Sequence, residues 1–260
     1  MFAITRLPSP NMQAGERTFV GRIEIDGALA IEQHRHYCQL LTDCGARVIT
    51  LDANSYLPDC AFVEDAAVVL DEIAIITRMG VESRREESAV IEAALKPYRE
   101  IARIEAPATL EGGDVLRVGK TLLIGQSSRT NEAGIRQLQA IAERFGYRVQ
   151  PIPVRQCLHL KTACCALPDG RLVVNTNWIE LPNARELNSQ SQAKLPPIEV
   201  PSEEPWGANF LSLNSKVIID SAYPGTAELI RQQGFEVLAI DLSEFAKAEA
   251  GVTCLSLLFA

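Results

Sequence analysis

The sequence predicts an α/β fold, a closed ring of ββαβ-like units. Helical patterns begin near residues 27, 83, 131, 182 and 226, about one for every fifty residues, and two or three strand patterns accompany each of them. A supersecondary unit that recurs at this period is typical of repeat architectures. The alternative is a doubly wound sheet, which usually carries a glycine-rich phosphate loop, and the chain contains no G-x-G-x-x-G or Walker pattern.

The composition is that of a water-soluble enzyme. Apolar residues make up 47% of the 260 residues and charged residues 22%, and we expect a single catalytic domain spanning residues 1–260. The net charge of −8 disfavours nucleic acid as a partner and suits a cationic small substrate. Seven cysteines without a C-x-x-C pair indicate reduced thiols, and no signal or membrane segment is evident, so we expect a cytoplasmic location.

The first unit is predicted from a strand at 2–5, a helix from Gly27 to Cys44 and a strand at 47–51. Asp26 is a suitable N-cap for the helix, and Gly45 is a suitable residue to end it. Its predicted apolar face is made by Ile31, His34, Tyr37, Cys38 and Leu41. His34 and His36 are interpreted as packing or surface residues because no acid or thiol is paired with them.

The second unit is predicted from strands at 61–70, 73–77 and 101–105. Ser83-Arg-Arg-Glu86 has the form of a capping box, which predicts a helix that begins there and runs to about residue 95. Pro97 then ends the helix.

The remaining units follow the same pattern. A strand at 122–125 precedes a helix over 131–145 that Gly146 ends, and Asp169-Gly170 is predicted to join two strands as a hairpin. Residues 179–204 are the least regular part and include the fourth helical pattern. Strands are predicted at 210–213, 217–220 and 236–240, a helix at 226–233, and a final strand after Gly251.

Three polar clusters interrupt apolar, strand-like surroundings, where an unpaired charge is unfavourable. Asp59, Glu64 and Asp65 suit a guanidinium group, although adjacent strand residues face opposite ways, so a bend is needed to bring Glu64 and Asp65 to one pocket. The alternative is surface charge at a sheet edge. In Glu111-Gly-Gly-Asp114 the glycines allow the backbone to approach a ligand closely, and the alternative is a turn with two solvated acids.

His159 lies between two leucines, and Cys254 lies at the start of the final strand. A buried structural histidine and a buried structural cysteine are the alternative interpretations. A cysteine nucleophile requires a general acid or base and an acid that orients it. Cys254, His159 and Glu111 are a sufficient set.

Six blocks occur in an order that resembles the dimethylarginine dimethylaminohydrolase family, within the guanidine-modifying superfamily of arginine deiminase and the amidinotransferases. The blocks are Leu57-Pro-Asp-Cys-Ala-Phe-Val-Glu-Asp65, Ser83-Arg-Arg85, Thr109-Leu-Glu-Gly-Gly-Asp114, Ser128-Arg-Thr-Asn131, Leu158-His-Leu-Lys-Thr162 and Val252-Thr-Cys-Leu-Ser256. The resemblance implies a five-bladed α/β propeller with pseudo-symmetry and a Cys/His/acid site that needs no cofactor and no metal. The loop 8–21 and the segment 179–207 match the family poorly.

The resemblance also implies a role for each matching residue. Cys254 would be the nucleophile, His159 the proton donor, and Glu111 the acid that binds a guanidinium nitrogen and assists His159. The other matching residues would bind the substrate: Asp65 at the guanidinium, Asp59 and Glu64 in positioning, and Arg84 and Arg129 at the α-carboxylate. The implied reaction converts Nω-methylated L-arginine and water to L-citrulline and dimethylamine or methylamine through a covalent thiouronium. A guanidino substrate and a homodimer are the expected partners.

The residue type at position 161, a lysine in this chain, distinguishes the members of the superfamily. Arginine deiminases and amidinotransferases resemble one another in having His-x-Asp, where this chain has His159-Leu-Lys161. The Asp of His-x-Asp supplies a second carboxylate for the guanidinium in those enzymes. The absence of this carboxylate here suits an alkylated guanidinium, which has fewer N–H donors. Arginine deiminase, an amidinotransferase and another guanidino-compound hydrolase remain alternatives, as does a non-catalytic binder of arginine-like ligands.

Overall fold

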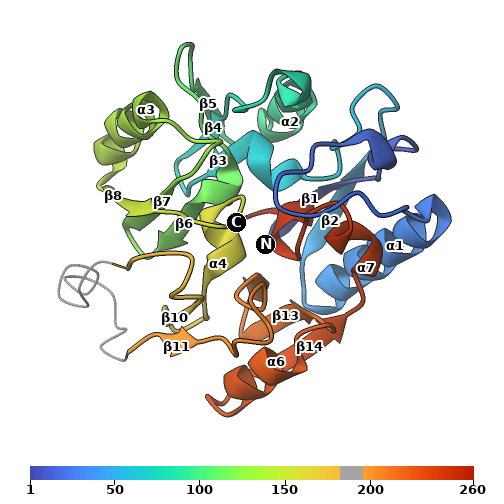
Figure 1. Cartoon of the computed structure of the whole chain (residues 1–260). Helices are drawn as coiled ribbons and strands as arrows, with labels where there is room; N and C mark the ends of the chain where they lie inside the picture. The colour runs from blue at the N-terminus through green and yellow to red at the C-terminus, as the bar shows by residue number, and fades with distance from the viewer. Residues whose placement is uncertain (182–195) are drawn as a thin grey trace.

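Five three-stranded sheets surround a central axis in the computed structural model, which describes residues 1–181 and 196–260 (Figure 1). In each sheet the middle strand pairs antiparallel with one neighbour and parallel with the other. An antiparallel pair followed by a crossover to a parallel strand is the predicted ββαβ unit. The five-bladed α/β propeller is therefore confirmed.

The strands and helices follow the repeat closely. The sheets comprise β15 (Leu257–Phe259), β1 (Phe2–Arg6) and β2 (Arg47–Leu51); β3 (Ala67–Val69), β4 (Ile73–Ile76) and β5 (Glu100–Arg103); β6 (Val115–Val118), β7 (Thr121–Gln126) and β8 (Arg148–Pro153); β9 (Cys164–Ala166), β10 (Leu172–Val174) and β11 (Ile198–Glu199); and β12 (Phe210–Leu213), β13 (Lys216–Asp220) and β14 (Glu236–Ile240). The helices are α1 (Gly27–Asp43), α2 (Glu87–Leu95), α3 (Glu132–Ala142), α4 (Leu160–Ala163), α6 (Pro224–Arg231) and α7 (Ser243–Ala246).

The two ends of the chain close the ring. β15 pairs antiparallel with β1, with Phe2 opposite Phe259 and Ile4 opposite Leu257, and both termini lie near the central axis (Figure 1). The rings of Phe2 and Phe259 stack with their centroids 5.4 Å apart. The predicted final strand is confirmed, and because it completes the first sheet, it closes the ring.

Each seam between neighbouring sheets is filled by one apolar cluster. Ile75 of β4 and Ile124 of β7, for example, belong to the cluster between the second and third sheets, and Leu123 and Val174 belong to the next one. These strands contribute buried side chains on both faces, which explains their nearly continuous apolar runs. None of the helices in the described part of the chain is long and apolar enough to cross a membrane.

The predicted helix ends agree with the structure at three positions. The Asp26 carboxylate accepts hydrogen bonds from the backbone N–H groups of Ala28 and Leu29, and Asn131 caps α3 in the same way. Gly45 follows α1 with a φ of +89°, a conformation that glycine adopts without strain. The predicted inner face of α1 is wrong at Ile31, which is 54% exposed, because Gln33 and Ala30 occupy the buried positions instead.

Other local predictions are corrected. The Ser83–Glu86 capping box does not form: residues Glu82–Arg84 make a 3-10 turn, Ser83 donates its hydroxyl hydrogen bond to Glu16, and α2 begins at Glu87. The predicted strand over 61–70 is limited to β3, because Val63–Ala66 form another 3-10 turn. The fourth helical pattern, near residue 182, lies outside the described residues.

Candidate active site

Cys254 lies in a 3-10 turn, Thr253–Leu255, immediately before β15. The backbone N–H of Gly251 lies 3.5 Å from its Sγ. Asn209 fixes the turn, since its side chain accepts a hydrogen bond from the Thr253 N–H at 3.1 Å and donates one to Thr253 Oγ1 at 3.1 Å. A Cβ at Gly251 would lie 2.4 Å from Asn209 Oδ1, so only glycine fits beside this amide. The sulfur therefore sits on a rigid turn rather than on the predicted strand.

His159 immediately precedes α4 and faces two carboxylates. Its Nε2 lies 2.7 Å from Oε2 of Glu111, and its Nδ1 lies 3.8 Å from Oδ1 of Asp65. Burial alone would lower the pKa of His159, but the charge of Asp65 and the hydrogen bond to Glu111 outweigh it and raise the pKa to about 9. The imidazole is therefore protonated at neutral pH and can act as an acid.

Gly112 and Gly113 allow this arrangement. A Cβ at Gly113 would lie 2.7 Å from Nδ1 of His159 and 2.8 Å from Oδ1 of Asp65, and a Cβ at Gly112 would lie 2.0 Å from the Glu64 carbonyl oxygen. The Gly113 N–H also donates a hydrogen bond to Asp65 Oδ1 at 3.1 Å. The glycine backbone thus approaches protein groups closely, and this is what brings the Glu111 and Asp65 segments together; its approach to a ligand stays a prediction.

Arg84 is surrounded by carboxylates. Its Nη1 donates to Asp65 Oδ2 at 2.9 Å, and its Nη2 and Nε donate to the two oxygens of Glu87 at 2.8 and 3.1 Å. Burial alone would raise the pKa of Asp65, but the charges of His159 and Arg84 outweigh it, so the pKa lies below its ordinary value. Asp65 is therefore held as a carboxylate between two cations, while Arg84 has few donors left for another ligand.

Asp59 and Arg129 carry buried polar atoms that have no hydrogen-bond partner. Within the described ranges, Asp59 Oδ1, Arg129 Nη1 and Arg6 Nη1 are the side-chain atoms in this condition. The first two line the same small pocket as Asp65, His159 and Cys254. Arg129 Nη1 lies 3.6 Å from Glu111 Oε1, an ion pair without a hydrogen bond. A buried acceptor and a buried donor without hydrogen bonds are unfavourable in the free protein, so they indicate a ligand that supplies both.

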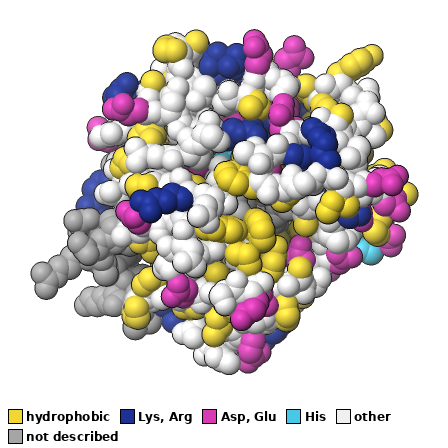
Figure 2. Space-filling model, in the orientation of Figure 1, with side chains coloured by type: hydrophobic (Ala, Val, Ile, Leu, Met, Phe, Trp, Pro, Cys, Tyr) yellow, Lys and Arg dark blue, Asp and Glu magenta, His cyan; other side chains and the backbone are white. Residues whose placement is uncertain are grey.

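A loop over residues 15–22 covers this pocket. The Glu16 N–H donates to Asp59 Oδ2 at 2.9 Å, and the Thr18 and Phe19 N–H groups donate to the two carboxylate oxygens of Glu249 at 2.6 and 2.9 Å. Glu249 also lines the pocket. On the face that the loop crosses, hydrophobic side chains gather in a hollow near the centre, with charged side chains of both signs around it (Figure 2).

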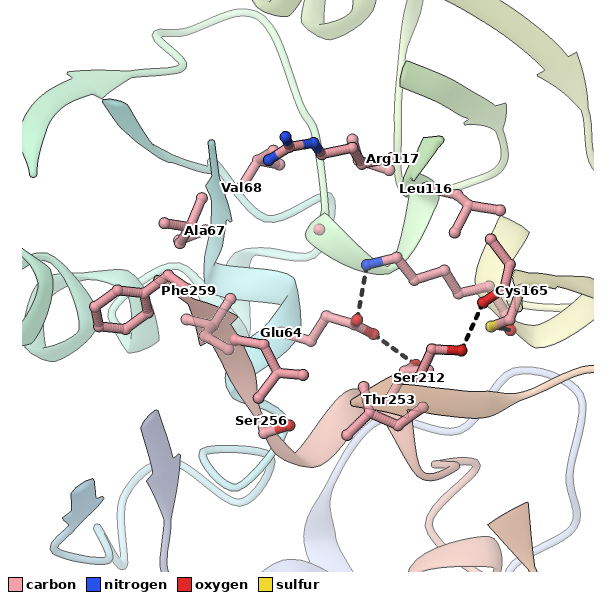
Figure 3. A pocket seen from close by; sticks show the side chains of 18 of the residues that line it. Glu64, Ala67, Val68, Leu116, Arg117, Cys165, Ser212, Thr253, Ser256 and Phe259 are labelled. Carbon is pink, nitrogen blue, oxygen red and sulfur yellow. Dashed lines mark hydrogen bonds and ion pairs between the residues drawn. The ribbon is translucent and has the colours of Figure 1, made fainter. Parts of the chain in front are cut away.

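Glu64 lies outside the pocket. It lines a separate cavity of about 370 Å³, where its carboxylate accepts hydrogen bonds from Lys161 Nζ and from Thr253 Oγ1, each at 2.7 Å (Figure 3). The 3-10 turn at Val63–Ala66 explains why the neighbouring Glu64 and Asp65 reach two different cavities. Of the eight predicted site residues, six line the pocket, Glu111 lies behind His159, and only Glu64 is directed elsewhere.

The Cys254 thiol is neutral in the free protein. Burial raises its pKa well above the ordinary value, and the negative charges of Glu64 and Asp65 raise it further. A cation bound beside Asp65 would act in the opposite direction and stabilise the thiolate.

Asp65, Glu111 and His159 are also the one group in the described part of the chain whose ligand atoms converge enough to hold a metal ion, all within 4.8 Å of one another. Arg84 and Arg129 already neutralise these carboxylates, with Arg129 Nη1 lying 3.6 Å from Glu111. A protonated His159 has no lone pair to offer. The local charges therefore favour proton transfer over metal binding.

Sequence reasoning did not assign three residues that support the site. Glu87 holds Arg84, Glu249 holds the covering loop, and Asn209 holds the cysteine turn. Asp114, noted only as part of a cluster, accepts hydrogen bonds from the Leu160 N–H and from the Ser127 hydroxyl, and so fixes the start of α4 beside His159. Glu249 lies between two small residues, Ala248 and Ala250, rather than in an apolar strand-like run, and no sequence signal identifies it.

Comparisons with known proteins agree with this geometry. A family model described as N,N dimethylarginine dimethylhydrolase, eukaryotic, matches residues 14–256. The N(G),N(G)-dimethylarginine dimethylaminohydrolase of Streptomyces coelicolor is 40% identical over 98% of this chain and 95% of its own length. The protein of the same name from Pseudomonas aeruginosa is 38% identical over 90% of both chains. The solved structure of the Pseudomonas protein, a mutant complexed with citrulline, superposes with a TM-score of 0.89 at 35% identity, covering 99% of this chain and 98% of that one.

Proposed function

The chain belongs to the dimethylarginine dimethylaminohydrolase family, and on that premise we propose that it hydrolyses Nω-methylated L-arginine to L-citrulline and an alkylamine. We propose further that residues 1–260 act as a single catalytic domain. The observation that carries the proposal is the pocket itself, in which a thiol, a protonated histidine, a paired carboxylate and two unpartnered polar atoms converge.

The substrate is proposed to satisfy the two unpartnered atoms with its amino-acid end. The α-ammonium group would donate to Asp59 Oδ1, and the α-carboxylate would accept from Arg129 Nη1. Arg84 was expected to share the carboxylate, but its donors are engaged by Asp65 and Glu87, so it would have to exchange partners to do so. We therefore assign the carboxylate mainly to Arg129.

The guanidinium group is proposed to lie against Asp65 at the pocket wall, with the negative charge of Glu111 acting on it from behind His159. Its positive charge would offset the negative charges that keep the Cys254 thiol neutral, so that substrate binding itself favours the thiolate. The nucleophile would then be generated only when the substrate is present.

The reaction follows in two halves. On substrate binding Cys254 releases its thiol proton to solvent. The thiolate Sγ bonds to the guanidinium carbon, and the C–N bond to the alkylated nitrogen breaks as that nitrogen takes a proton from His159, leaving a neutral His159 and a covalent thiouronium. Neutral His159 then accepts a proton from water as the water oxygen bonds to the same carbon, and the C–S bond breaks to release citrulline and the thiol. His159 begins protonated, as its raised pKa requires.

Glu64 is proposed to act through the cysteine turn, because its carboxylate joins Lys161 to Thr253 instead of facing the pocket. This gives Lys161 a structural partner and leaves Asp65 and Glu111 as the carboxylates for the guanidinium. Two carboxylates suit a guanidinium that has lost donors through methylation, which disfavours the alternative of an arginine deiminase.

The test is a substrate panel. The purified chain is supplied with dimethylarginine, monomethylarginine, arginine and short guanidino acids, and citrulline and released amine are both quantified. We expect the highest kcat/KM with a methylated arginine and equal amounts of citrulline and alkylamine. Faster hydrolysis of free arginine, with ammonia as the product, would support the deiminase instead.

A further inference from the structure

A second cavity, of about 210 Å³, adjoins the catalytic pocket. Thr162, Glu249 and Ala250 line both of them, so the two spaces share a wall. The second cavity is also lined by Trp206, Asp220 and Tyr223, which have no part in the proposed reaction. Its volume is several times that of a water molecule, about 30 Å³ in the liquid, so it can hold a small organic molecule.

Asp220 is a buried residue that contributes a carboxyl group to the lining of this cavity. It ends β13, and only 4% of the residue is exposed. Its Oδ1 accepts a hydrogen bond from the Ala222 N–H at 2.9 Å, and over residues 1–181 and 196–260 its Oδ2 receives none. Burial raises the pKa of this carboxyl group, and the negative charge of Asp241 raises it further, against the smaller opposing effect of the Ala222 hydrogen bond. Among the described residues, Asp220 Oδ2 therefore has no hydrogen-bond donor; it is not one of the fully enclosed atoms noted above, and as part of the cavity wall it is open to a ligand.

The charge of the lining is negative. Asp220 and Glu249 contribute two carboxylates, and none of the lining residues is a lysine, arginine or histidine. The Glu249 carboxylate is partly satisfied by the Thr18 and Phe19 N–H groups, but these carry no net charge. A cation is therefore the complementary ligand, and an anion would be repelled.

The aromatic side chains indicate which kind of cation fits. Trp206 packs edge-on against Trp178 with ring centroids 5.2 Å apart, and it still has 37% of its surface exposed. Tyr223 lies close enough to Asp220 that, together with burial, the carboxylate raises the pKa of the phenol to about 12. Aromatic rings beside a carboxylate favour methylated ammonium ions, whose charge is spread over apolar methyl groups.

We propose that this cavity is a binding site for a small alkylammonium ion, held by Asp220 and by the rings of Trp206 and Tyr223. Resting on the proposed function, we assign to it the amine that leaves the neighbouring pocket. That amine departs with the proton of His159 and takes up another from water to become an alkylammonium ion. The shared wall at Thr162 and Ala250 is where it would cross.

The test measures binding without turnover. The full chain is titrated with dimethylammonium chloride, against sodium chloride at equal ionic strength, while tryptophan fluorescence is recorded. We expect saturable binding that citrulline does not compete away, because the two ligands occupy different cavities. Asp220→Asn should weaken the binding about 10-fold or more, the usual loss when one charged partner is removed. Asp43→Asn, which removes an exposed carboxylate outside the cavity, should leave it unchanged.

Trp206→Leu is a second variant. Because Trp206 is partly exposed, its replacement should leave the fold intact, and it should also weaken the binding of dimethylammonium. Absence of saturable binding, competition by citrulline, or equal affinity in wild type and Asp220→Asn would each overturn the proposal. Because no substrate is hydrolysed in this assay, a failure of the proposed reaction leaves its result intact. A separate measurement tests whether the ligand of this cavity is the amine released by the reaction. Product inhibition by dimethylammonium should be relieved in Asp220→Asn.

Discussion

Nε2 of His159 lies 2.7 Å from Oε2 of Glu111, and the two residues are only 4% and 0% exposed. In this buried setting the carboxylate holds the imidazole in one orientation and favours its charged form. The pair therefore supplies a proton donor that stays protonated through the neutral pH range. Several consequences can be measured.

Glu111→Gln should lower the pKa of His159 from about 9, because the hydrogen bond to a charged carboxylate is lost, although the larger effect of the Asp65 charge remains. The titration is followed by NMR of the imidazole resonances. The raised pKa of His159 also makes the free energy of unfolding depend on pH. Its stabilising contribution is complete below about pH 6.5 and is lost as the pH rises through about 9. A His159 pKa that stays near 9 in the variant would contradict the assigned pairing.

Gly113→Ala should reduce kcat/KM by about 100-fold, since its new methyl group would lie within 2.8 Å of both His159 and Asp65 and displace them. Steady-state kinetics with dimethylarginine give the value, and citrulline binding reports whether the pocket persists. Gly27→Ala is the matched control, because no atom lies within 4 Å of its added Cβ. Equal kinetics in the two variants would show that the glycine pair has no special role.

Asp59→Asn should lower kcat/KM for dimethylarginine by about 10- to 100-fold, the loss expected for one hydrogen bond to a charged group. The same variant should turn over a dimethylguanidino acid without an α-amino group at the wild-type rate. The comparison of the two substrates isolates the proposed contact with the α-ammonium group. An equal loss with both substrates would mean that Asp59 acts elsewhere.

Glu64→Gln should shift the alkylation of Cys254 by iodoacetamide to lower pH. After burial, the negative charge of Glu64 is the next largest effect that raises the thiol pKa, so its removal favours the thiolate. The rate of alkylation is measured against pH in the free protein. Glu82→Gln, at a side chain that is 90% exposed, is the control and should show the wild-type profile. A shift to higher pH in Glu64→Gln would refute this electrostatic coupling.

Much of the ring could be predicted because its signals are local. Asp26 and Asn131 cap their helices within three residues, and apolar runs mark β4 and β7 regardless of what packs against them. The 3-10 turns that carry Glu64 and Cys254 were predicted as strands, because their apolar residues are β-prone and the turns depend on tertiary contacts.

The site was predictable where polar residues interrupt apolar sequence. Asp65, Glu111 and His159 were identified in this way, and the structure brings them together. Glu64 and Asp65 face different cavities, as the alternation of adjacent residues indicated, but the pairing of Glu64 with Lys161 could not be predicted, since it depends on contacts across the ring. Nor could the link from Glu249 to Thr18, because 231 residues separate the two partners.

Cys254→Ser tests the central claim most directly, with turnover of dimethylarginine and binding of citrulline measured on the same preparation. The account predicts that citrulline formation falls by about 1000-fold or more, since serine in this acidic pocket is a far weaker nucleophile. Citrulline should bind with nearly unchanged affinity, because Asp59, Asp65 and Arg129 are intact. Turnover close to that of the wild type would contradict the assignment of Cys254 as the nucleophile.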